Sequence, residues 1–242
     1  MMRERPRDDG RLLVVSPHLD DAVLGCAQLL AVSADAVVLT VFAGKAEDEV
    51  LRTDWDAACG FASAGEAMRA RAREDDAALA VLGARACRLE FPDDQYRRGS
   101  ASIDPNALAE AVRAALHRYR PQTVAIPCGL FHRDHELAHA AALHVCRSET
   151  SREWLAYEDA FYRRIPGLLQ QRLCWLDRAG IEATPLALAH GDAGLKRRAV
   201  HCYASQMRGL ASPGRPGELD AFAPEGYWRL TLRTRDGGPE CQ

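Results

Sequence analysis

The sequence has neither an excess of basic residues nor a long uninterrupted apolar segment. Its 31 lysines and arginines stand against 34 aspartates and glutamates in 242 residues, which gives a formal net charge of −3. Nucleic acids and anionic membranes attract basic surfaces, so this balance argues against both as partners. The longest apolar stretch, residues 31–43, is interrupted by Ser33, Asp35 and Thr40 and is too short to span a bilayer.

The sequence also shows neither closely spaced cysteine pairs nor the pattern of a secretory leader. The eight cysteines are scattered along the chain, and no two of them form a C-x-x-C pair. Single cysteines in a chain of this length are typical of small buried side chains in a reducing compartment. The amino-terminal residues are charged and lead into a short strand-like run rather than a secretory apolar region. We therefore expect a cytoplasmic protein.

Three glycine-based signatures are absent as well. The sequence contains no G-x-G-x-x-G after its first apolar run and no G-x-x-x-x-G-K-[ST], the two devices that cradle nucleotide phosphates. It also lacks G-x-S-x-G, the nucleophile turn of many serine hydrolases. These absences argue against a nucleotide-binding protein and against a serine hydrolase.

Short apolar runs of strand length alternate with longer amphipathic segments. We expect strands at residues 11–16, 36–42, 87–91, 123–127, 154–157 and 228–232. We expect helices at residues 21–33, 66–82, 106–118, 134–146 and 193–207, with Asp20 or Asp21 available to cap the first. This alternation predicts an α/β protein with a three-layer, Rossmann-like arrangement around a mainly parallel sheet. The length fits a single domain over residues 1–242, with a mobile tail after about residue 235.

Metal-competent side chains are concentrated in two segments that follow expected strands. Pro17-His18-Leu19-Asp20-Asp21 comes directly after the first strand, and His132-Arg133-Asp134-His135 follows the strand at 123–127. In open α/β sheets, ligands bind beyond the carboxyl ends of the strands. We therefore expect both segments to border one site. A long connection after the second strand, which contains Trp55, Cys59, Gly60 and Phe61, is expected to form part of its wall.

The residue types in these segments fit a hydrolytic metal site. His18 and Asp21 lie three residues apart across a strand-to-helix turn, so both can face one ion. A centre of one carboxylate and two imidazoles lowers the pKa of bound water to about 7. Asp20 is the nearest carboxylate that can accept the proton of that water, although it can also serve as a helix cap. His132 is available to stabilise an oxyanion, and Asp134 to orient His132 or hold its charge.

The order P-H-L-D-D and then H-R-D-H-x-x-x-H resembles the zinc-dependent de-N-acetylases of the PIG-L/LmbE-like family, which remove an acyl group from the amino group of glucosamine-type sugars. The resemblance covers about residues 11–207. It also includes four shorter matches: Arg71-x-x-Glu74 with Ala78 and Leu82-Gly83, Phe91-Pro92-Asp93, Tyr157-Glu158-Asp159, and Lys196 with Tyr203-x-Ser205-Gln206.

The resemblance implies roles for individual residues. It implies one Zn²⁺ per chain, bound by His18, Asp21 and His135, with Asp20 as general base and His132 acting on the tetrahedral intermediate. It further implies that Arg71 and Asp93 contact the substrate. Three positions depart from the pattern of many relatives: Leu19 and Arg133 stand in place of proline, and Asp94 in place of glycine.

We therefore predict a zinc-dependent N-deacetylase, a hydrolase of linear amides, whose partner is a small N-acylated amino sugar or its conjugate. Three alternatives stay open: a zinc amidase for a non-sugar amide such as a thiol conjugate, a catalytically silent metal-binding relative, and a metalloprotease using the H-E-x-x-H run at residues 135–139. The sequence leaves open the acyl group, the aglycone, the oligomeric state and whether His139, Tyr157 or Lys196 contributes. A His₂Asp set also accepts Fe²⁺, Co²⁺ or Mn²⁺.

Overall fold

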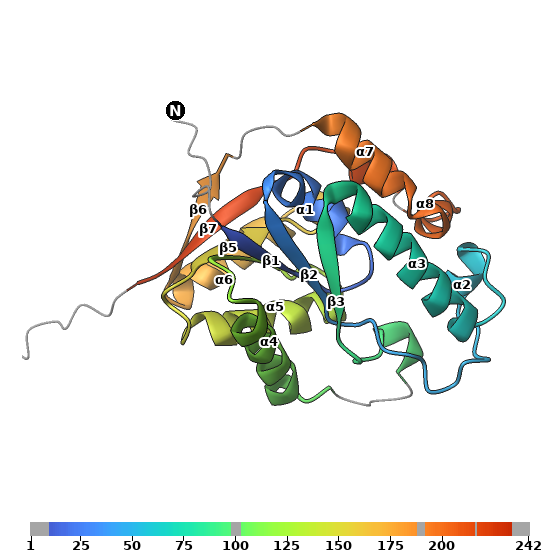
Figure 1. Ribbon diagram of the computed structural model, residues 1–242, viewed down its shortest axis with the longest axis horizontal. Helices are drawn as coiled ribbons and strands as arrows, with labels where there is room; N and C mark the ends of the chain where they lie inside the picture. Colours follow the sequence, from blue (N-terminus) through green and yellow to red (C-terminus); the bar gives the residue numbers. More distant parts are fainter. Residues whose placement is uncertain (1–9, 98–102, 188–191, 216, 234–242) are drawn as a thin grey trace, which may run out of the picture.

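The computed structural model describes residues 10–97, 103–187, 192–215 and 217–233 and contains one seven-stranded sheet. The tail expected after residue 235 lies outside these residues. The strands are β1 (Arg11–Ser16), β2 (Asp35–Thr40), β3 (Ala84–Arg88), β4 (Thr123–Pro127), β5 (Glu153–Tyr157), β6 (Ile181–Leu186) and β7 (Tyr227–Leu232). Their order across the sheet is β3-β2-β1-β4-β5-β7-β6 (Figure 1).

The sheet is mainly parallel, as the alternation of strands and helices predicts. The four pairings among β3, β2, β1, β4 and β5 are all parallel. Only β7 runs against its neighbours β5 and β6. The strands therefore form a Rossmann-like α/β sheet with an antiparallel extension at one edge.

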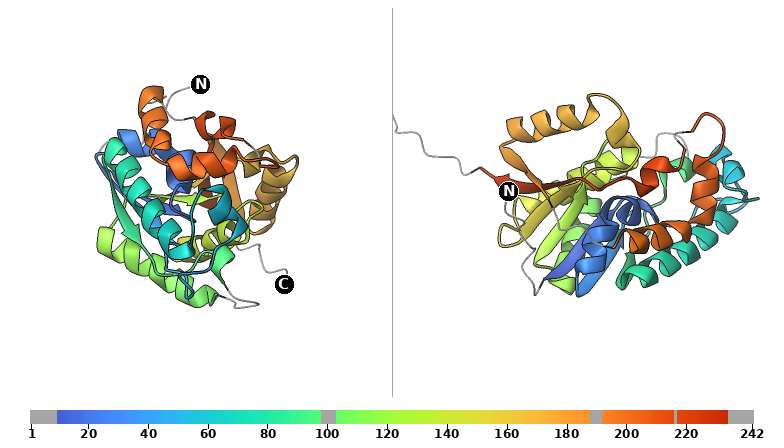
Figure 2. Two further views of the ribbon diagram at one scale, coloured as in Figure 1. Left: turned by 90° about the vertical axis from the view of Figure 1, so that its right-hand side faces the viewer. Right: turned by 90° about the horizontal axis from the view of Figure 1, so that it is seen from above.

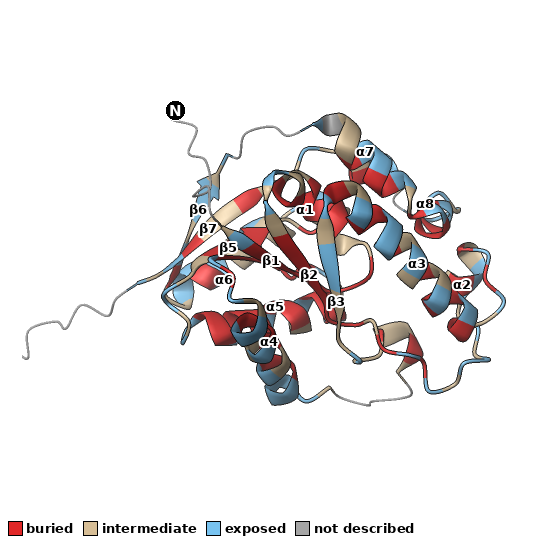
Figure 3. Cartoon of the chain, in the orientation of Figure 1, coloured by how far each residue is buried: buried red, intermediate tan, exposed pale blue. Residues whose placement is uncertain are grey.

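Helices cover both faces of the sheet and make three layers (Figures 1 and 2). One face packs against α1 (Asp21–Val32), α3 (Ala64–Leu82) and α7 (Ala193–His201), and the other against α4 (Pro105–Tyr119) and α5 (Arg133–Cys146). Because successive side chains of a strand point to opposite faces, Leu12 and Val14 enter the first core and Leu13 and Val15 the second. All four are buried, as expected of the interior of a parallel strand that is covered on both faces (Figure 3).

The remaining elements are helices and 3₁₀ turns in the connections. They are α2 (Asp54–Ala58), α6 (Leu168–Arg178), α8 (Ala204–Leu210) and the 3₁₀ turns Asp94–Tyr96, Tyr162–Arg164 and Leu219–Phe222.

Three sequence expectations differ from the structure. The helix expected at 193–207 is two helices, α7 and α8, separated at Cys202–Tyr203. The strand expected at 87–91 begins earlier, because Gly83 ends α3 in a left-handed conformation and β3 follows at once. Helix α6 and strand β6 were not expected. Strand β6 lies at the sheet edge and is largely exposed, so its sequence lacks the apolar run of the central strands.

The order of the strands reverses between β1 and β4, and this point positions the site. Strand β1 pairs in parallel with β2 on one side and with β4 on the other. The connections that leave the carboxyl ends of β1 and β4 therefore diverge to opposite faces and open a crevice between them. The two metal-competent segments run from these connections into the first turns of α1 and α5. None of the helices within the described residues is long and apolar enough to cross a membrane.

Gly129 allows the β4–α5 connection to pass close to α5. Its φ is +74°, and a Cβ added there would lie 2.5 Å from the His139 Cβ and 3.0 Å from the His135 carbonyl oxygen. We expect Gly129→Ala to lower the free energy of unfolding by about 2–4 kcal/mol, through backbone strain and overpacking together. Urea denaturation measures this change.

Gly83→Ala is the matched control. Gly83 has a similar φ of +69°, but a Cβ there would have no atom within 4 Å. We expect it to lose only about 1–2 kcal/mol, the cost of the left-handed backbone. Equal losses for the two variants would contradict the close approach at Gly129.

Candidate metal centre

The β1–α1 connection and the first turns of α1 and α5 meet at a carboxylate held between two imidazoles. The Oδ2 atom of Asp21 lies 3.2 Å from Nδ1 of His18 and 3.3 Å from Nε2 of His135. The possible ligand atoms of these three residues all lie within 4.8 Å of one another. The backbone N–H of His18 also donates to Asp21 Oδ2, at 2.8 Å, which fixes the turn between them.

The second nitrogen of each imidazole contacts a further carboxylate. His18 Nε2 lies 3.0 Å from Asp134 Oδ2, and His135 Nδ1 lies 2.6 Å from Asp159 Oδ1. Asp134 and Asp159 are both buried. Metal-binding histidines commonly direct their other ring nitrogen at a carboxylate, which fixes the ring and makes the ligand more basic. The His₂Asp donor set and its outer carboxylates therefore fit a zinc ion.

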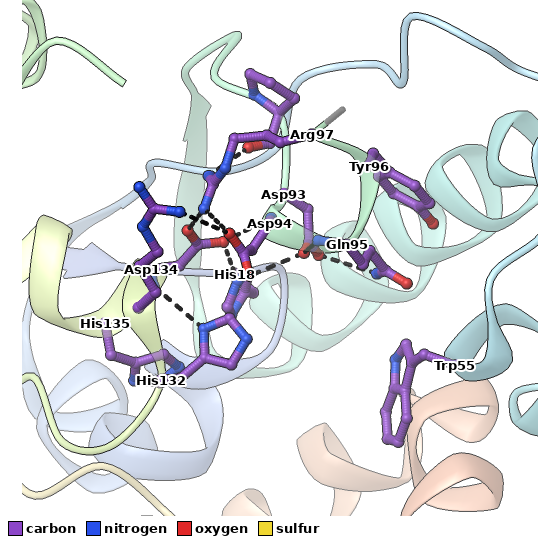
Figure 4. Close-up of polar contacts among 12 residues, drawn as sticks. His18, Trp55, Asp93, Asp94, Gln95, Tyr96, Arg97, His132, Asp134 and His135 are labelled. Atoms are coloured by element: carbon purple, nitrogen blue, oxygen red, sulfur yellow. Dashed lines mark hydrogen bonds and ion pairs between the residues drawn. The ribbon is translucent and has the colours of Figure 1, made fainter. Parts of the chain in front are cut away.

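The two outer carboxylates are themselves anchored. Asp134 accepts a hydrogen bond from Arg97 Nη2 at 2.5 Å and from the backbone N–H of Asp94 at 2.9 Å (Figure 4). Asp159 accepts from the backbone N–H of Leu130 at 3.1 Å. Each imidazole is thus connected through its carboxylate to a different loop of the molecule.

The charges of the cluster stabilise one another. Burial alone would lower the pKa of His135, but the charge of Asp21 and the hydrogen bond to Asp159 raise it to about 9. Burial would raise the pKa of Asp21, but the adjacent His135 and His18 hold it well below its usual range. Carboxylates and imidazoles are donor types that bind a divalent cation. Binding of the cation displaces the protons that the imidazoles carry.

Asp20 lies beside the cluster and outside it. It occupies the N-cap position of α1, yet its side chain makes no capping hydrogen bond. The capping role considered from the sequence is therefore not observed. Burial and the charge of Asp21 raise the pKa of the Asp20 carboxyl to about 6. Asp20 lines the cleft that opens over the cluster.

His132 caps helix α5 with its ring. The backbone N–H of Asp134 donates to His132 Nδ1 at 3.2 Å. Because an amide N–H can only donate, Nδ1 carries the lone pair and the ring proton resides on Nε2. Burial and the nearby charges of His18 and His135 lower the pKa of His132, which favours this neutral form.

The carboxylate of Asp134 has a different partner from the one expected. From the sequence we expected it to orient His132 or hold its charge. Instead the carboxylate contacts His18, and only the backbone N–H of Asp134 contacts His132 (Figure 4). The reason is helical geometry, since the ring of the N-cap residue accepts from the second helical N–H while the Asp134 side chain projects toward the β1 loop.

Arg71 and Asp93 are brought together near the cluster, although 22 residues separate them. Arg71 Nη1 lies 3.2 Å from Asp93 Oδ2, and Asp93 Oδ1 lies 4.0 Å from His18 Nε2. Burial would raise the pKa of Asp93, but the charges of His18 and Arg71 lower it to about 2. The buried Nε of Arg71 has no hydrogen-bond partner among the described residues. Arg71 also lines the cleft.

A cleft of about 480 Å³ opens over these residues. Its floor is polar, with His18, Asp20, Asp21, Arg71 and Asp93. Its rim is largely apolar and includes Trp55, Phe131, Phe161, Tyr162 and Ile165, together with the exposed Arg215. Of the connection expected to contribute a wall, Trp55 lines the cleft, whereas Cys59, Gly60 and Phe61 are not among the lining residues.

Three contributors were given no role from the sequence. Asp159 belongs to the Tyr157-Glu158-Asp159 match, and its place just past strand β5, next to β4 in the sheet, was a usable signal for a role in the site. Arg97 and Tyr162 gave no such signal, because each reaches the site through tertiary packing. Tyr162 stacks on His132, with ring centroids 6.3 Å apart and planes 19° apart, and meets His135 edge-on at 5.1 Å.

Tyr157 and Lys196 lie away from the cleft. The Tyr157 hydroxyl donates to the Val15 carbonyl at 2.9 Å. Lys196 Nζ pairs with Glu225 at 2.9 Å and donates to the Leu24 carbonyl at 3.0 Å. Both side chains are buried and bridge elements of the core, so their contacts are structural.

Within the described residues, two groups of side chains could hold a metal ion, His18–Asp21–His135 and His18–His132–Asp134, and His139 belongs to neither. Its Nδ1 lies 2.8 Å from the Pro127 carbonyl oxygen, and its buried Nε2 has no hydrogen-bond partner there. The H-E-x-x-H interpretation needs His135 and His139 on one ion, and this arrangement does not support it.

The fold and the site define a class: a Rossmann-like α/β protein with a His₂Asp centre at the switch point of its sheet. The family model described as PIG-L, GlcNAc-PI de-N-acetylase, matches residues 13–146. This chain belongs to the PIG-L family of de-N-acetylases.

Solved structures extend the similarity to nearly the whole chain. A deacetylase triple mutant of the teicoplanin biosynthetic pathway is 28% identical, with a TM-score of 0.76, over 93% of this chain and 99% of its own. The A40926 pseudoaglycone deacetylase Dbv21 is 25% identical, with a TM-score of 0.71, over 94% and 99%. N,N'-diacetylchitobiose deacetylase from Pyrococcus horikoshii, 17% identical with a TM-score of 0.52 over 85% and 74%, shares the fold. Among curated proteins, none matches this sequence.

The contact between Asp159 and His135 predicts an effect on metal affinity. We expect Asp159→Asn to weaken zinc binding by about 10–100-fold, because the amide neither fixes the His135 ring as strongly nor raises its basicity. Competition against a chromophoric chelator measures the affinity. Glu158→Gln is the control, since Glu158 accepts from Trp228 Nε1 and not from the cluster. Equal zinc affinities for Asp159→Asn and the control would contradict this role.

Burial of His139 predicts a pH dependence of stability. Burial and the charge of Arg172 lower its pKa to about 4, against about 6.5 when unfolded. Between these values the unfolded chain binds a proton that the folded chain does not, so this contribution falls as the pH drops from about 7 to 4. The loss is on the order of 3 kcal/mol.

Urea denaturation of wild type and His139→Leu at several pH values isolates the effect of His139. We expect the free energy of unfolding of wild type to fall relative to that of His139→Leu as the pH falls. A difference that is constant from pH 7 to pH 4 would contradict it.

Proposed function

We propose that this protein is a zinc-dependent N-deacetylase that hydrolyses the amide of an N-acylated amino sugar or its conjugate. The observation that carries the proposal is the cluster of His18, Asp21 and His135 at the floor of the cleft, with Asp20 beside it. Membership of the PIG-L family supports the amide as the bond that is cleaved. We also propose that the chain forms a single domain, because its helices pack on one continuous sheet.

His18, Asp21 and His135 would hold the zinc. Zinc bound to such a set would lower the pKa of a bound water and polarise the carbonyl of the substrate amide. Asp134 and Asp159 hold the two imidazoles in place, so the donor set is preorganised.

Asp20 acts as general base and then as general acid. Its carboxylate accepts a proton from the attacking water as the C–O bond forms, and it delivers that proton to the amine nitrogen as the C–N bond breaks. The products are a carboxylic acid and a free amino group. Two observations support this role: Asp20 lines the cleft, and its side chain is not used to cap α1.

His132 stabilises the oxyanion that develops on the amide oxygen. Its Nδ1 accepts from the Asp134 amide, so Nε2–H is the ring donor that is available. The cap on α5 and the stacking of Tyr162 fix the direction of this donor before substrate arrives. Preorganised donors of this kind stabilise a transition state without reorganisation during the reaction.

Arg71 and Asp93 bind the polar part of the substrate. Asp93 accepts from Arg71 and from the Gln95 side chain at 3.1 Å, which holds the guanidinium in place. The remaining N–H groups of Arg71 can then donate to hydroxyl or carbonyl oxygens of a sugar. This hydrogen-bonding floor favours a sugar over an apolar amide.

Replacement of the base tests the proposal. We expect Asp20→Asn to lower kcat for amine release from N-acetylglucosamine derivatives by about 10²–10⁴-fold, the usual contribution of a general base. Zinc content should stay near one per chain, because Asp20 is not in the ligand set. Amine release and metal content are measured on the same zinc-loaded preparation.

Asp54→Asn, at an exposed position in α2, is the control and should retain activity. Full activity of Asp20→Asn would contradict the role of the base. A zinc-loaded wild type that releases no amine from sugar amides but does so from thiol-conjugate amides would move the substrate to the non-sugar class.

A further inference from the structure

An exposed aromatic surface borders the metal centre at its His132 end. We call Phe131, Tyr162 and Ile165 the aromatic ledge; all three line the cleft. The Phe131 side chain is 65% exposed, and its ring lies 5.4 Å from that of Tyr162, with the planes 36° apart. Because Tyr162 also stacks on His132, the ledge is continuous with the centre.

The backbone places the ledge through two strained turns. The His132 N–H donates to the Leu130 carbonyl at 2.7 Å around Phe131, whose φ is +63°. The Tyr162 N–H donates to the Ala160 carbonyl at 2.8 Å around Phe161, whose φ is +66° and ψ −49°. Both are γ-turns of the rare form, which bulky residues adopt only when the surrounding structure enforces it.

Buried carboxylates enforce both turns. Asp159, which orients His135, also accepts from the Leu130 N–H at the start of the first turn. Asp220 accepts from the Phe161 N–H at 2.5 Å in the second, and it pairs with Arg163 at 3.3 Å. The ledge is therefore rigid and is held partly by the same groups that hold the centre.

A rigid, uncharged aromatic surface binds planar apolar groups by offset stacking. The ledge lies on the rim, with Phe131 largely exposed, so its occupant is a part of the substrate that projects out of the cleft. The acetyl group carries the reacting carbonyl, so in the proposed complex it lies at the floor of the cleft, beside the metal centre. In the view of Figure 4, His132, next to the ledge, and Trp55 lie on opposite sides of Asp93, and all three residues line the cleft.

We propose that the aromatic ledge binds an aromatic aglycone attached to the amino sugar, so that the preferred substrates are aryl conjugates rather than free N-acetylglucosamine. This inference rests on the proposed function. It assigns Phe131 as the residue that determines specificity, through contact with the aglycone and not with the reacting atoms.

The test compares phenyl and methyl glycosides of N-acetylglucosamine with zinc-loaded protein. We expect kcat/KM for the phenyl glycoside to exceed that for the methyl glycoside by about tenfold. Phe131→Ala should remove most of this ratio, and Phe131→Tyr should restore it. Taking a ratio cancels any shift of His132 that follows from the change at Phe131, because the two substrates share the same chemistry. Val32→Ala, at a 55% exposed position at the far end of α1, should leave the ratio unchanged.

Binding of the two deacetylated glycosides, measured by calorimetry, separates this inference from the proposed function. Tighter binding of the phenyl compound that is lost in Phe131→Ala, without amine release from any substrate, would support the ledge and overturn the deacetylase. Amine release with a ratio near one, or with a ratio that Phe131→Ala leaves unchanged, would overturn the ledge alone. A preference for longer N-acyl chains that is lost in Phe131→Ala would also overturn it, because the acyl group would then occupy the ledge.

Discussion

The position of one carboxylate, Asp21, determines how the rest of the site is arranged. Its Oδ2 atom contacts His18 from the loop after β1 and His135 from the first turn of α5, and so it joins the segments that follow β1 and β4. A buried carboxylate is costly unless it is paired, and here two basic rings supply the pairing. The adjacent Asp20 is excluded from this arrangement and is left facing the cleft. Two neighbouring acids therefore occupy environments with opposite effects on their pKa values.

The sheet topology is what allows these connections to meet. The rule that ligands bind where parallel strands diverge predicted that His18 and His135 would be close, although 117 residues separate them in the sequence. The central strands and the helices between them were predictable for a related reason, since buried parallel strands are apolar throughout. The edge strand β6 was not, because exposure removes that signal. The periodicity of apolar residues likewise does not indicate the break between α7 and α8 at Cys202–Tyr203.

The outer part of the site was less predictable than its centre. His18, Asp20 and Asp21 form a compact motif whose chemistry is visible in the sequence, whereas Arg97 reaches Asp134 only because a 3₁₀ turn brings it there. The partner of the Asp134 carboxylate depended on the direction in which a helical side chain projects, which spacing alone does not give. Orientation of functional groups by buried neighbours is thus a tertiary property, even where the groups themselves are local.

His132 combines two roles, because it caps helix α5 and is also proposed to stabilise the oxyanion. Histidine is not among the preferred N-cap residues, and serine, asparagine or aspartate would satisfy the same amide at least as well. A lineage that lost the need for the activity could therefore gain helix stability by replacing His132, without disturbing the fold. Under the role proposed for His132, the identity of this residue in related sequences would separate retained activity from drift toward a purely structural role.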